Sequence, residues 1–282
     1  MSSIFDFDSP PDQYAVMGNP IAHSKSPAIH SAFARQTKQK MVYDAIQVDA
    51  GGFKQAVGNF RANGGKGLNI TLPFKHEAFQ IVDQMTDRAK KAGAVNTIIF
   101  KPEGTLFGDN TDGAGFLRDI KINHSGYLKN RRILLLGAGG ATRGIISPIC
   151  QENPAEIIIA NRTIDKAISL ANEFASSTPI NAVGFNELEG MHFDLIVNGT
   201  SASLQGETLP LPESILDKDC WCYDLMYAKE NTVFLDWASR HGAEILVDGL
   251  GMLVEQAAES FYQWRGVRPE TVNVIKDIRA AL

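Results

Sequence analysis

The chain has 282 residues, a formal net charge of −5 and 44% hydrophobic residues, which suffices for about two domains with large cores. The negative charge excludes nucleic acid as the main partner, because a protein that neutralises phosphates needs a basic surface. The three cysteines lack C-x-x-C spacing and give no disulfide framework. No apolar run approaches the roughly 20 residues of a membrane helix, and the start of the chain lacks the apolar region of a secretory signal. We therefore predict a cytoplasmic protein that binds a small-molecule substrate, as a monomer or homodimer, with no nucleic-acid or membrane partner.

Short β-branched runs alternate with helical patterns along the chain, which is typical of an α/β fold. Pro27, directly after Ser26, indicates the start of the first helix. In the first third of the chain the pattern predicts strands at 13–18, 41–49, 66–71 and 94–100, separated by helices at 27–37, 51–63 and 74–85.

A second series of strands begins at Ile133. A helix over 111–124 joins the two series, and the last helices begin at Gly251, after the final strand. The alternation predicts two units with parallel sheets and a ligand site in the cleft between them. The further strands of the second series are expected at 156–161, 193–200, 220–226 and 243–249.

A glycine-rich turn follows the first strand of the second series, in the stretch ILLLGAGGATRG. Gly137 ends the strand, Gly139 and Gly140 lack the Cβ atoms that would block a pyrophosphate, and Gly144 lets the next helix pack closely. The start of that helix offers N–H groups to an anion. Thr142 takes the third glycine position of G-x-G-x-x-G, so the match is imperfect. The turn predicts a nucleotide site, and a tight turn without a ligand is the alternative.

The next strand ends at Asn161, Arg162 and Thr163, where NAD-binding proteins carry a carboxylate for the ribose 2′-hydroxyl. The Arg162 guanidinium can form two parallel hydrogen bonds to a phosphate, and Lys166 adds a second positive charge. These residues predict NADP rather than NAD as the cofactor. In the alternative interpretation, Arg162 and Lys166 are solvated charges and Thr163 is only a helix cap.

Small polar residues gather at the strand ends of the first series, and such a set suits a small hydroxylated anion. Each residue also has a structural interpretation, such as a helix cap for Ser26 or a solvated charge for Lys75. The six histidines form no H-E-x-x-H or comparable cluster, so we predict no metal site. The polar set consists of Ser24, Ser26, Asn69, Thr71, Lys75, Asn96 and Asp112.

Together with the glycine turn, these segments resemble the shikimate dehydrogenase family over nearly the whole chain. The resemblance implies a substrate-binding domain over 1–111, to which 251–282 returns, and a Rossmann-like NADP-binding domain over 112–250. It also implies the reversible, NADPH-dependent reduction of 3-dehydroshikimate to shikimate, a step towards chorismate and the aromatic amino acids. The motifs are the serine pair before Pro27, N-x-T-x-P-x-K at 69–75, A-V-N-T at 94–97, G-D-N-T-D-G at 108–113, N-R-T-x-x-K at 161–166 and G-L-G-M-x-x-x-Q at 249–256.

The resemblance also implies roles for individual residues. Ser24 and Ser26 would bind the substrate carboxylate. The ring hydroxyls would be held by Asn69, Thr71, Asn96 and Asp112, with Gln256 and Tyr227 closing the pocket. The cofactor would contact Gly137, Ala138, Gly139, Gly140, Ala141, Asn161, Arg162, Thr163, Lys166, Leu225 and Gly249. The sequence departs from the family pattern at Gly199 and at Lys166, where arginine is also common, and both changes keep the same physical chemistry.

Lys75 and Asp112 form the predicted catalytic pair. Hydride transfer to a ketone leaves an alkoxide, which needs a proton from a donor within about 3 Å. Lysine is protonated at neutral pH, and an adjacent carboxylate favours that charge. Which of the two residues moves the proton stays open, because coupled groups titrate as a unit. Two other functions also stay open: a quinate/shikimate dehydrogenase of broader specificity, and an NADPH-sensing module without catalysis.

Overall fold

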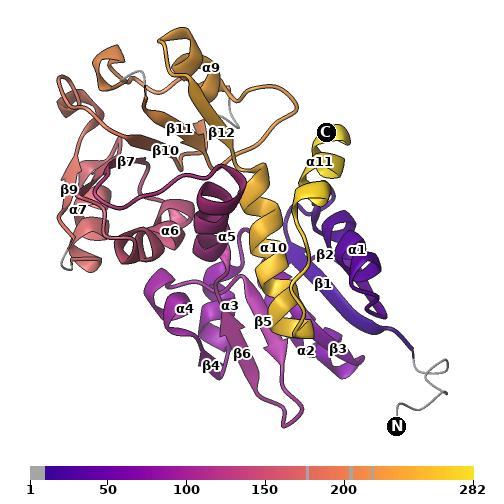
Figure 1. Ribbon diagram of the computed structural model, residues 1–282. Helices are drawn as coiled ribbons and strands as arrows, with labels where there is room; N and C mark the ends of the chain where they lie inside the picture. Colours follow the sequence, from indigo (N-terminus) through magenta and orange to yellow (C-terminus); the bar gives the residue numbers. More distant parts are fainter. Residues whose placement is uncertain (1–9, 176–177, 203–205, 217–218) are drawn as a thin grey trace. The chain divides into compact units, whose positions relative to one another are not determined.

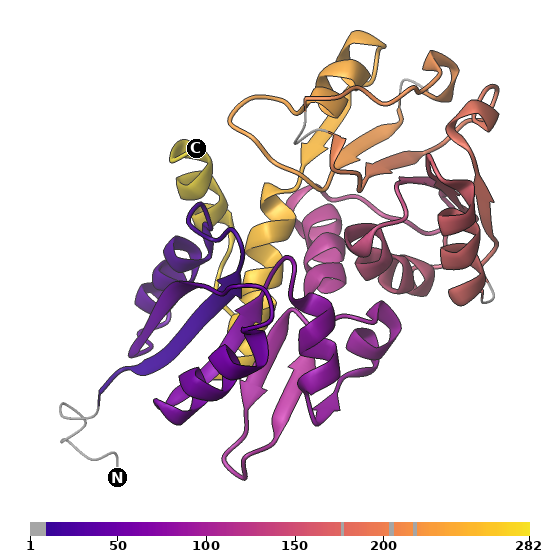
Figure 2. The same ribbon diagram turned by 180° about the vertical axis from the view of Figure 1, so that it is seen from behind.

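The computed structural model describes residues 10–175, 178–202, 206–216 and 219–282 (Figure 1). The acidic start of the chain at 1–9, on which part of the localisation prediction rests, lies outside the described residues. The chain divides into two compact units. Unit 1 contains Met1–Thr111 and Ala257–Val274, and unit 2 contains Asp112–Gln256 and Ile275–Leu282. Figures 1 and 2 show, from opposite sides, the helices that flank the sheet of each unit.

Unit 1 is built on a six-stranded sheet in the order β2-β1-β3-β5-β6-β4. Its strands are β1 (Asp12–Gly18), β2 (Met41–Gln47), β3 (Gly65–Ile70), β4 (Gln84–Met85), β5 (Thr97–Phe100) and β6 (Leu106–Asp109). Its helices are α1 (Ser26–Gln36), α2 (Phe53–Ala62), α3 (Lys75–Ile81), α4 (Asp87–Ala92) and the second part of α10 (Leu250–Arg265).

Strand β1 is buried on both faces because its side chains alternate between two layers of helices. Ala15 and Met17 pack into an apolar cluster with residues of α2 and α3. Tyr14 and Val16 point the other way, and Trp264 of α10 packs against this second cluster. Helix α10 therefore completes the core of unit 1.

The prediction of parallel strands is confirmed for β2, β1 and β3 but is wrong for β5. Strand β5 runs antiparallel to both β3 and β6. The short turn between β5 and β6 accounts for the antiparallel pairing of these two strands, because parallel neighbours need a crossover of about a dozen residues or more. The sequence pattern does not reveal β4 or β6, since such short strands show little alternation. The helix expected over 74–85 ends at Ile81, and part of the remainder forms β4.

Unit 2 has an all-parallel, six-stranded sheet in the order β12-β11-β10-β7-β8-β9. Counted from its own first strand, β7, this is the 3-2-1-4-5-6 order of a Rossmann domain. The strands are β7 (Arg132–Leu136), β8 (Glu156–Ala160), β9 (Ile180–Val183), β10 (Leu195–Asn198), β11 (Trp221–Asp224) and β12 (Ile245–Asp248). The helices are α5 (Asp112–Arg118), α6 (Gly140–Gln151), α7 (Ile164–Glu173), α9 (Val233–Arg240), the first part of α10 and most of α11 (Val272–Ala280), with short 3₁₀ turns at Phe185–Glu187 and Glu213–Ile215.

Both faces of this sheet are covered, as a doubly wound fold requires. Ile133 and Leu135 of β7 pack into a cluster with residues of α5, α6 and α7. Leu134 and Leu136 point to the opposite face and pack with residues of α9. The helix expected over 111–124 is α5 followed by one π-helical turn, Asp119–Asn123. Within the described ranges, no helix combines the length and apolar character needed to cross a membrane.

Candidate active site

The glycine turn of unit 2 lies where the strand order of its sheet reverses, between β7 and β10, and doubly wound sheets bind ligands at this point. Gly137 has φ of 95°, a conformation that favours glycine. Gly139 and Gly140 are exposed, and a Cβ on either would meet no described atom within 4 Å. Gly139 is the N-cap residue of α6 and has no side chain to bond the first N–H groups. The turn therefore leaves room and hydrogen-bond donors for an anion.

The residues that follow β8 lie beside this turn. The Ala138 N–H donates a 3.3 Å hydrogen bond to Asn161 Oδ1, which ties the two segments together. Asn161 Nδ2 donates to the Thr163 carbonyl at 2.8 Å. Thr163 takes the N-cap position of α7, yet no described backbone N–H donates a cap bond to its side chain. Arg162 and Lys166 of the same segment are both exposed.

The carboxyl ends of β11 and β12 bring Leu225 and Gly249 together. The Gly249 N–H donates to the Met226 carbonyl at 3.0 Å, and a Cβ on Gly249 would overlap the Leu225 carbonyl. This close approach requires glycine. Tyr227 follows on the same loop, where burial and the charge of Asp248 raise its pKa. The contacts of these residues with nicotinamide or substrate stay predictions.

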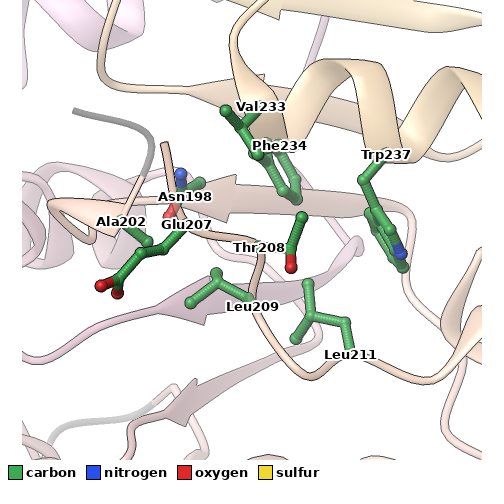
Figure 3. A pocket seen from close by; sticks show the side chains of 9 residues that line it. All are labelled: Asn198, Ala202, Glu207, Thr208, Leu209, Leu211, Val233, Phe234 and Trp237. Atoms are coloured by element: carbon green, nitrogen blue, oxygen red, sulfur yellow. The ribbon is translucent and has the colours of Figure 1, made fainter. Parts of the chain in front are cut away.

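A small pocket lies between β10, α9 and the segment around Thr208 (Figure 3). Phe234 and Trp237 of α9 contribute apolar walls to it. All of the predicted site residues are described, and none of them lines this pocket. We therefore place neither the nucleotide nor the substrate there.

Unit 1 contains a buried cluster of amide and hydroxyl side chains around the carboxyl end of β3 and the start of β5. Of its members, the sequence analysis identifies Asn69 and Asn96. Thr97 and Thr111 lie inside the A-V-N-T and G-D-N-T-D-G motifs, so these motifs could also have been used to predict both threonines as members of the cluster. The full set is Tyr43, Asn69, Asn96, Thr97, Thr111 and Ser260.

Backbone groups fix the orientation of both amides in this cluster. The Thr111 N–H donates to Asn96 Oδ1 at 2.9 Å, and a backbone N–H can only donate, so the acceptor is the oxygen. Asn69 Nδ2 donates to the Asn96 carbonyl at 3.2 Å, which identifies that atom as nitrogen. Asn69 Oδ1 accepts a 2.7 Å hydrogen bond from the Tyr43 hydroxyl. The two side chains are thus ordered by the protein itself.

Ser260 connects the cluster to helix α10. Its hydroxyl lies 3.0 Å from Asn69 Nδ2, 2.8 Å from Thr97 Oγ1 and 3.2 Å from Thr111 Oγ1. Ser260 is 191 residues away from Asn69 in the chain, so sequence spacing gave no signal for it. The helix completes the polar cluster as well as the apolar core of unit 1.

The other predicted substrate ligands of unit 1 begin helices or precede them. Ser26 is buried at the first position of α1, and its N–H donates to Ser24 Oγ at 3.3 Å. Burial raises the pKa of Tyr43. Lys75 is the half-buried first residue of α3, four residues after Thr71.

Asp112 is the first residue of α5 in unit 2, and glycines let this helix pack closely. A Cβ on Gly113 would lie 2.8 Å from the Gly144 carbonyl of α6, and a Cβ on Gly115 would lie 2.6 Å from the Gln256 nitrogen of α10. Asp112 and Gln256 are thereby carried by two helices in direct contact. Lys75 belongs to unit 1, so its pairing with Asp112 stays a prediction. Among the described residues, no three His, Cys, Asp or Glu side chains are grouped to hold a metal ion.

Comparison with known proteins assigns the chain to a family. It matches the shikimate dehydrogenase substrate binding domain over 16–98, shikimate / quinate 5-dehydrogenase over 120–206 and the shikimate 5′-dehydrogenase C-terminal domain over 249–282. Shikimate dehydrogenase (NADP(+)) of Alkalilimnicola ehrlichii is 53% identical, over 95% of this chain and 98% of that protein. The corresponding protein of Dechloromonas aromatica is 54% identical, over 96% of this chain and 98% of its own. The chain belongs to the shikimate dehydrogenase family.

The fold agrees with a solved structure of the shikimate dehydrogenase family. Shikimate 5-dehydrogenase from Thermus thermophilus, in complex with NADP(H) and shikimate, superposes with a TM-score of 0.85 at 32% identity. The alignment covers 96% of this chain and 100% of that one. The resemblance seen in the sequence and the predicted fold class of two α/β units, one of them Rossmann-like, are both confirmed.

Proposed function

We propose that this chain catalyses the NADP-linked, reversible reduction of 3-dehydroshikimate to shikimate, a step towards chorismate and the aromatic amino acids. The observation that carries the proposal is the 53–54% identity with curated shikimate dehydrogenases (NADP(+)) over nearly the whole chain. The exposed glycine turn, tied to Asn161 and followed along that segment by the exposed cations Arg162 and Lys166, supports the cofactor. The buried amide and hydroxyl cluster supports a polyhydroxylated substrate, since each such group can donate or accept a hydrogen bond.

On the substrate side, Ser24 and Ser26 bind the carboxylate through their hydroxyl groups. Asn96 and Asn69 bind the ring hydroxyls. The orientation of both amides is already fixed in the free protein, which reduces the entropy lost on binding. The remaining ligands of the ring are Thr71, Asp112, Gln256 and Tyr227.

On the cofactor side, the start of α6 with Gly139 and Gly140 holds the pyrophosphate. Arg162 and Lys166 hold the 2′-phosphate, which a carboxylate at this position would repel. Leu225 and Gly249 border the nicotinamide. When bound, NADPH supplies the hydride that reduces the substrate ketone.

Lys75 donates the proton that the developing alkoxide takes up, and Asp112 favours the charged ammonium from which this proton comes. In the reverse direction the neutral amine of Lys75 accepts the proton from the alcohol. The reaction balances because the carbonyl carbon gains a hydride and the carbonyl oxygen gains a proton.

The test is a spectrophotometric assay at 340 nm with the purified chain. We expect absorbance to rise with shikimate and NADP⁺, and to rise far more slowly with NAD⁺. Preferred turnover of quinate with NAD⁺ would instead favour a dehydrogenase of broader specificity. Inertness with both substrates and both cofactors would favour a sensing module. The cytoplasmic location, the lack of a nucleic-acid partner and the choice between monomer and homodimer stay predictions.

A further inference from the structure

The second glycine of the G-L-G-M motif, Gly251, has no role in the proposed function. It is buried in the first turn of α10, and a Cβ there would overlap the carboxylate of Asp119. Asp119 begins the π-helical turn that follows α5, and it is fully buried. Glycine at 251 therefore lets a carboxylate lie against the start of a 16-residue helix, where the helix dipole favours negative charge.

Asp119 is held by two hydrogen-bond donors, and one of them also reaches α10. The Tyr223 hydroxyl donates to Asp119 Oδ2 at 2.5 Å, and Asn123 Nδ2 donates to Oδ1 at 2.8 Å. Asp119 itself lies against the first turn of α10 at Gly251, so Tyr223 and Asn123 fix the carboxylate that borders this turn.

A second carboxylate fixes the next turn of the same helix. Arg118 Nε donates to Glu255 Oε2 at 2.9 Å, and Asn123 Nδ2 donates to Glu255 Oε1 at 3.2 Å. Gln256 follows directly, and its backbone packs against Gly115 of α5. The π-helical turn and α5 therefore contact α10 at Gly251, Glu255 and Gln256.

We propose that Asp119 is a positioning residue, which acts through the first turn of α10, against which it lies, to set the place of Gln256 and hence the affinity for substrate. The inference rests on the proposed function, because it takes Gln256 as a ligand of a ring hydroxyl.

The carboxyl group of Asp119 lies where burial disfavours its charged form. Burial raises its pKa, although the hydrogen bonds from Tyr223 and Asn123 and the nearby His124 act in the opposite direction. Glu255 also faces it and raises the pKa further. A neutral amide would avoid this desolvation cost only by giving up one of the two oxygens that accept from Tyr223 and Asn123.

The first test compares Asp119→Asn with the unchanged chain in the 340 nm assay and in thermal unfolding at pH 7. We expect the KM for shikimate to rise about 5- to 20-fold. We expect kcat to change less than about threefold. The melting temperature should fall, because an amide keeps only one of the two oxygens that accept from Tyr223 and Asn123. Tyr223→Phe removes a donor that holds the Asp119 carboxylate and should also raise the KM. A lowered melting temperature with an unchanged KM in both variants would make the pair merely structural and overturn the proposal.

A double-mutant cycle tests whether the effect passes through Gln256. In a Gln256→Ala background, Asp119→Asn should change the KM less than about twofold. The full effect in that background would overturn the proposal. The matched control is Asp194→Asn at the opposite end of the sheet, where Asp194 accepts bonds from Arg131 and from the Arg132 N–H, both at 2.8 Å. This control should lower the melting temperature and leave the KM unchanged.

Amide hydrogen exchange separates this inference from the proposed function, because it needs no substrate. In Asp119→Asn the amides of 250–256 should exchange faster, whereas those of β7 should not. Failure of the unchanged chain to oxidise shikimate would reject the proposed function alone. Unchanged exchange over 250–256 would reject the positioning role whatever the activity.

Discussion

Unit 1 and unit 2 present their predicted ligand groups in different ways. In unit 1 the predicted ligands include buried side chains, held in place by hydrogen bonds such as the one from Tyr43 to Asn69. The predicted cofactor ligands of unit 2 include backbone N–H groups at an exposed glycine turn and the surface cations Arg162 and Lys166. Substrate hydroxyls need groups of fixed direction, whereas a phosphate is attracted by charge that tolerates some movement. We therefore expect substitutions in unit 1 to affect folding and binding together, and substitutions of the unit 2 cations to affect binding alone.

The largest expected effect concerns chemistry rather than binding and comes from Lys75 in unit 1. Lys75→Ala should lower kcat by about 10²- to 10⁴-fold, since general acid catalysis contributes this much, and should raise the KM for shikimate far less. Steady-state kinetics with shikimate and NADP⁺ measure both. Near-normal turnover would remove Lys75 from the mechanism.

The unit 2 side of the comparison is tested by Arg162→Ala. Loss of a charge-assisted hydrogen bond should raise the KM for NADP⁺ by about 10- to 150-fold, with little change for NAD⁺. The melting temperature should not change, because Arg162 is exposed. Arg240→Ala, also exposed in unit 2, is the matched control and should alter neither quantity. An equal rise in KM for NADP⁺ and NAD⁺ would mean that Arg162 does not bind the 2′-phosphate.

The unit 1 side is tested by Thr97→Val, which keeps the shape and removes a buried hydroxyl. Thr97 Oγ1 donates to Asn96 Oδ1 at 2.9 Å, accepts from Asn69 Nδ2 at 3.1 Å and lies 2.8 Å from the Ser260 hydroxyl, so the substitution costs three buried groups a partner. We expect the free energy of unfolding, measured with urea, to fall by about 1–3 kcal/mol and the KM for shikimate to rise. Thr97→Ser restores the hydroxyl and should recover most of both losses. A change in only the free energy of unfolding or only the KM would contradict the expectation that unit 1 substitutions affect folding and binding together.

The smallest effect is a pH dependence that starts from His30 in unit 1. The His30 ring is fully buried, stacks on Tyr43 at 4.1 Å, and burial lowers its pKa to about 3. The native state keeps His30 neutral, while the unfolded chain takes up a proton near pH 6.5. Its contribution to stability is therefore complete above that pH and declines as the pH falls towards 3.

Between pH 7 and pH 5, this single group should lower the free energy of unfolding by about 2 kcal/mol. Urea unfolding at the two pH values, compared with His30→Phe, isolates the contribution. Asp119 in unit 2 acts in the opposite direction. Its raised pKa means that the native state binds a proton more tightly than the unfolded chain, so its own contribution declines as the pH rises through that pKa. The same decline in His30→Phe as in the unchanged chain would exclude His30 as its source.

The sequence by itself determined the features that depend on local spacing. The glycine turn, the cationic end of β8 and the alternation of strands and helices each need only neighbouring residues, so the pattern reveals the α/β class and the nucleotide fingerprint. The motifs of the polar cluster are also local, which is why Asn69 and Asn96 could be predicted.

The tertiary structure decided everything that joins distant segments. Ser260, Tyr43 and Asp119 acquire their contacts only when strands and helices from remote parts of the chain pack together, and the direction of β5 depends on the turn that follows it. Hydrogen bonds inside a core are directional and short-ranged, so their partners are set by packing and not by spacing along the chain.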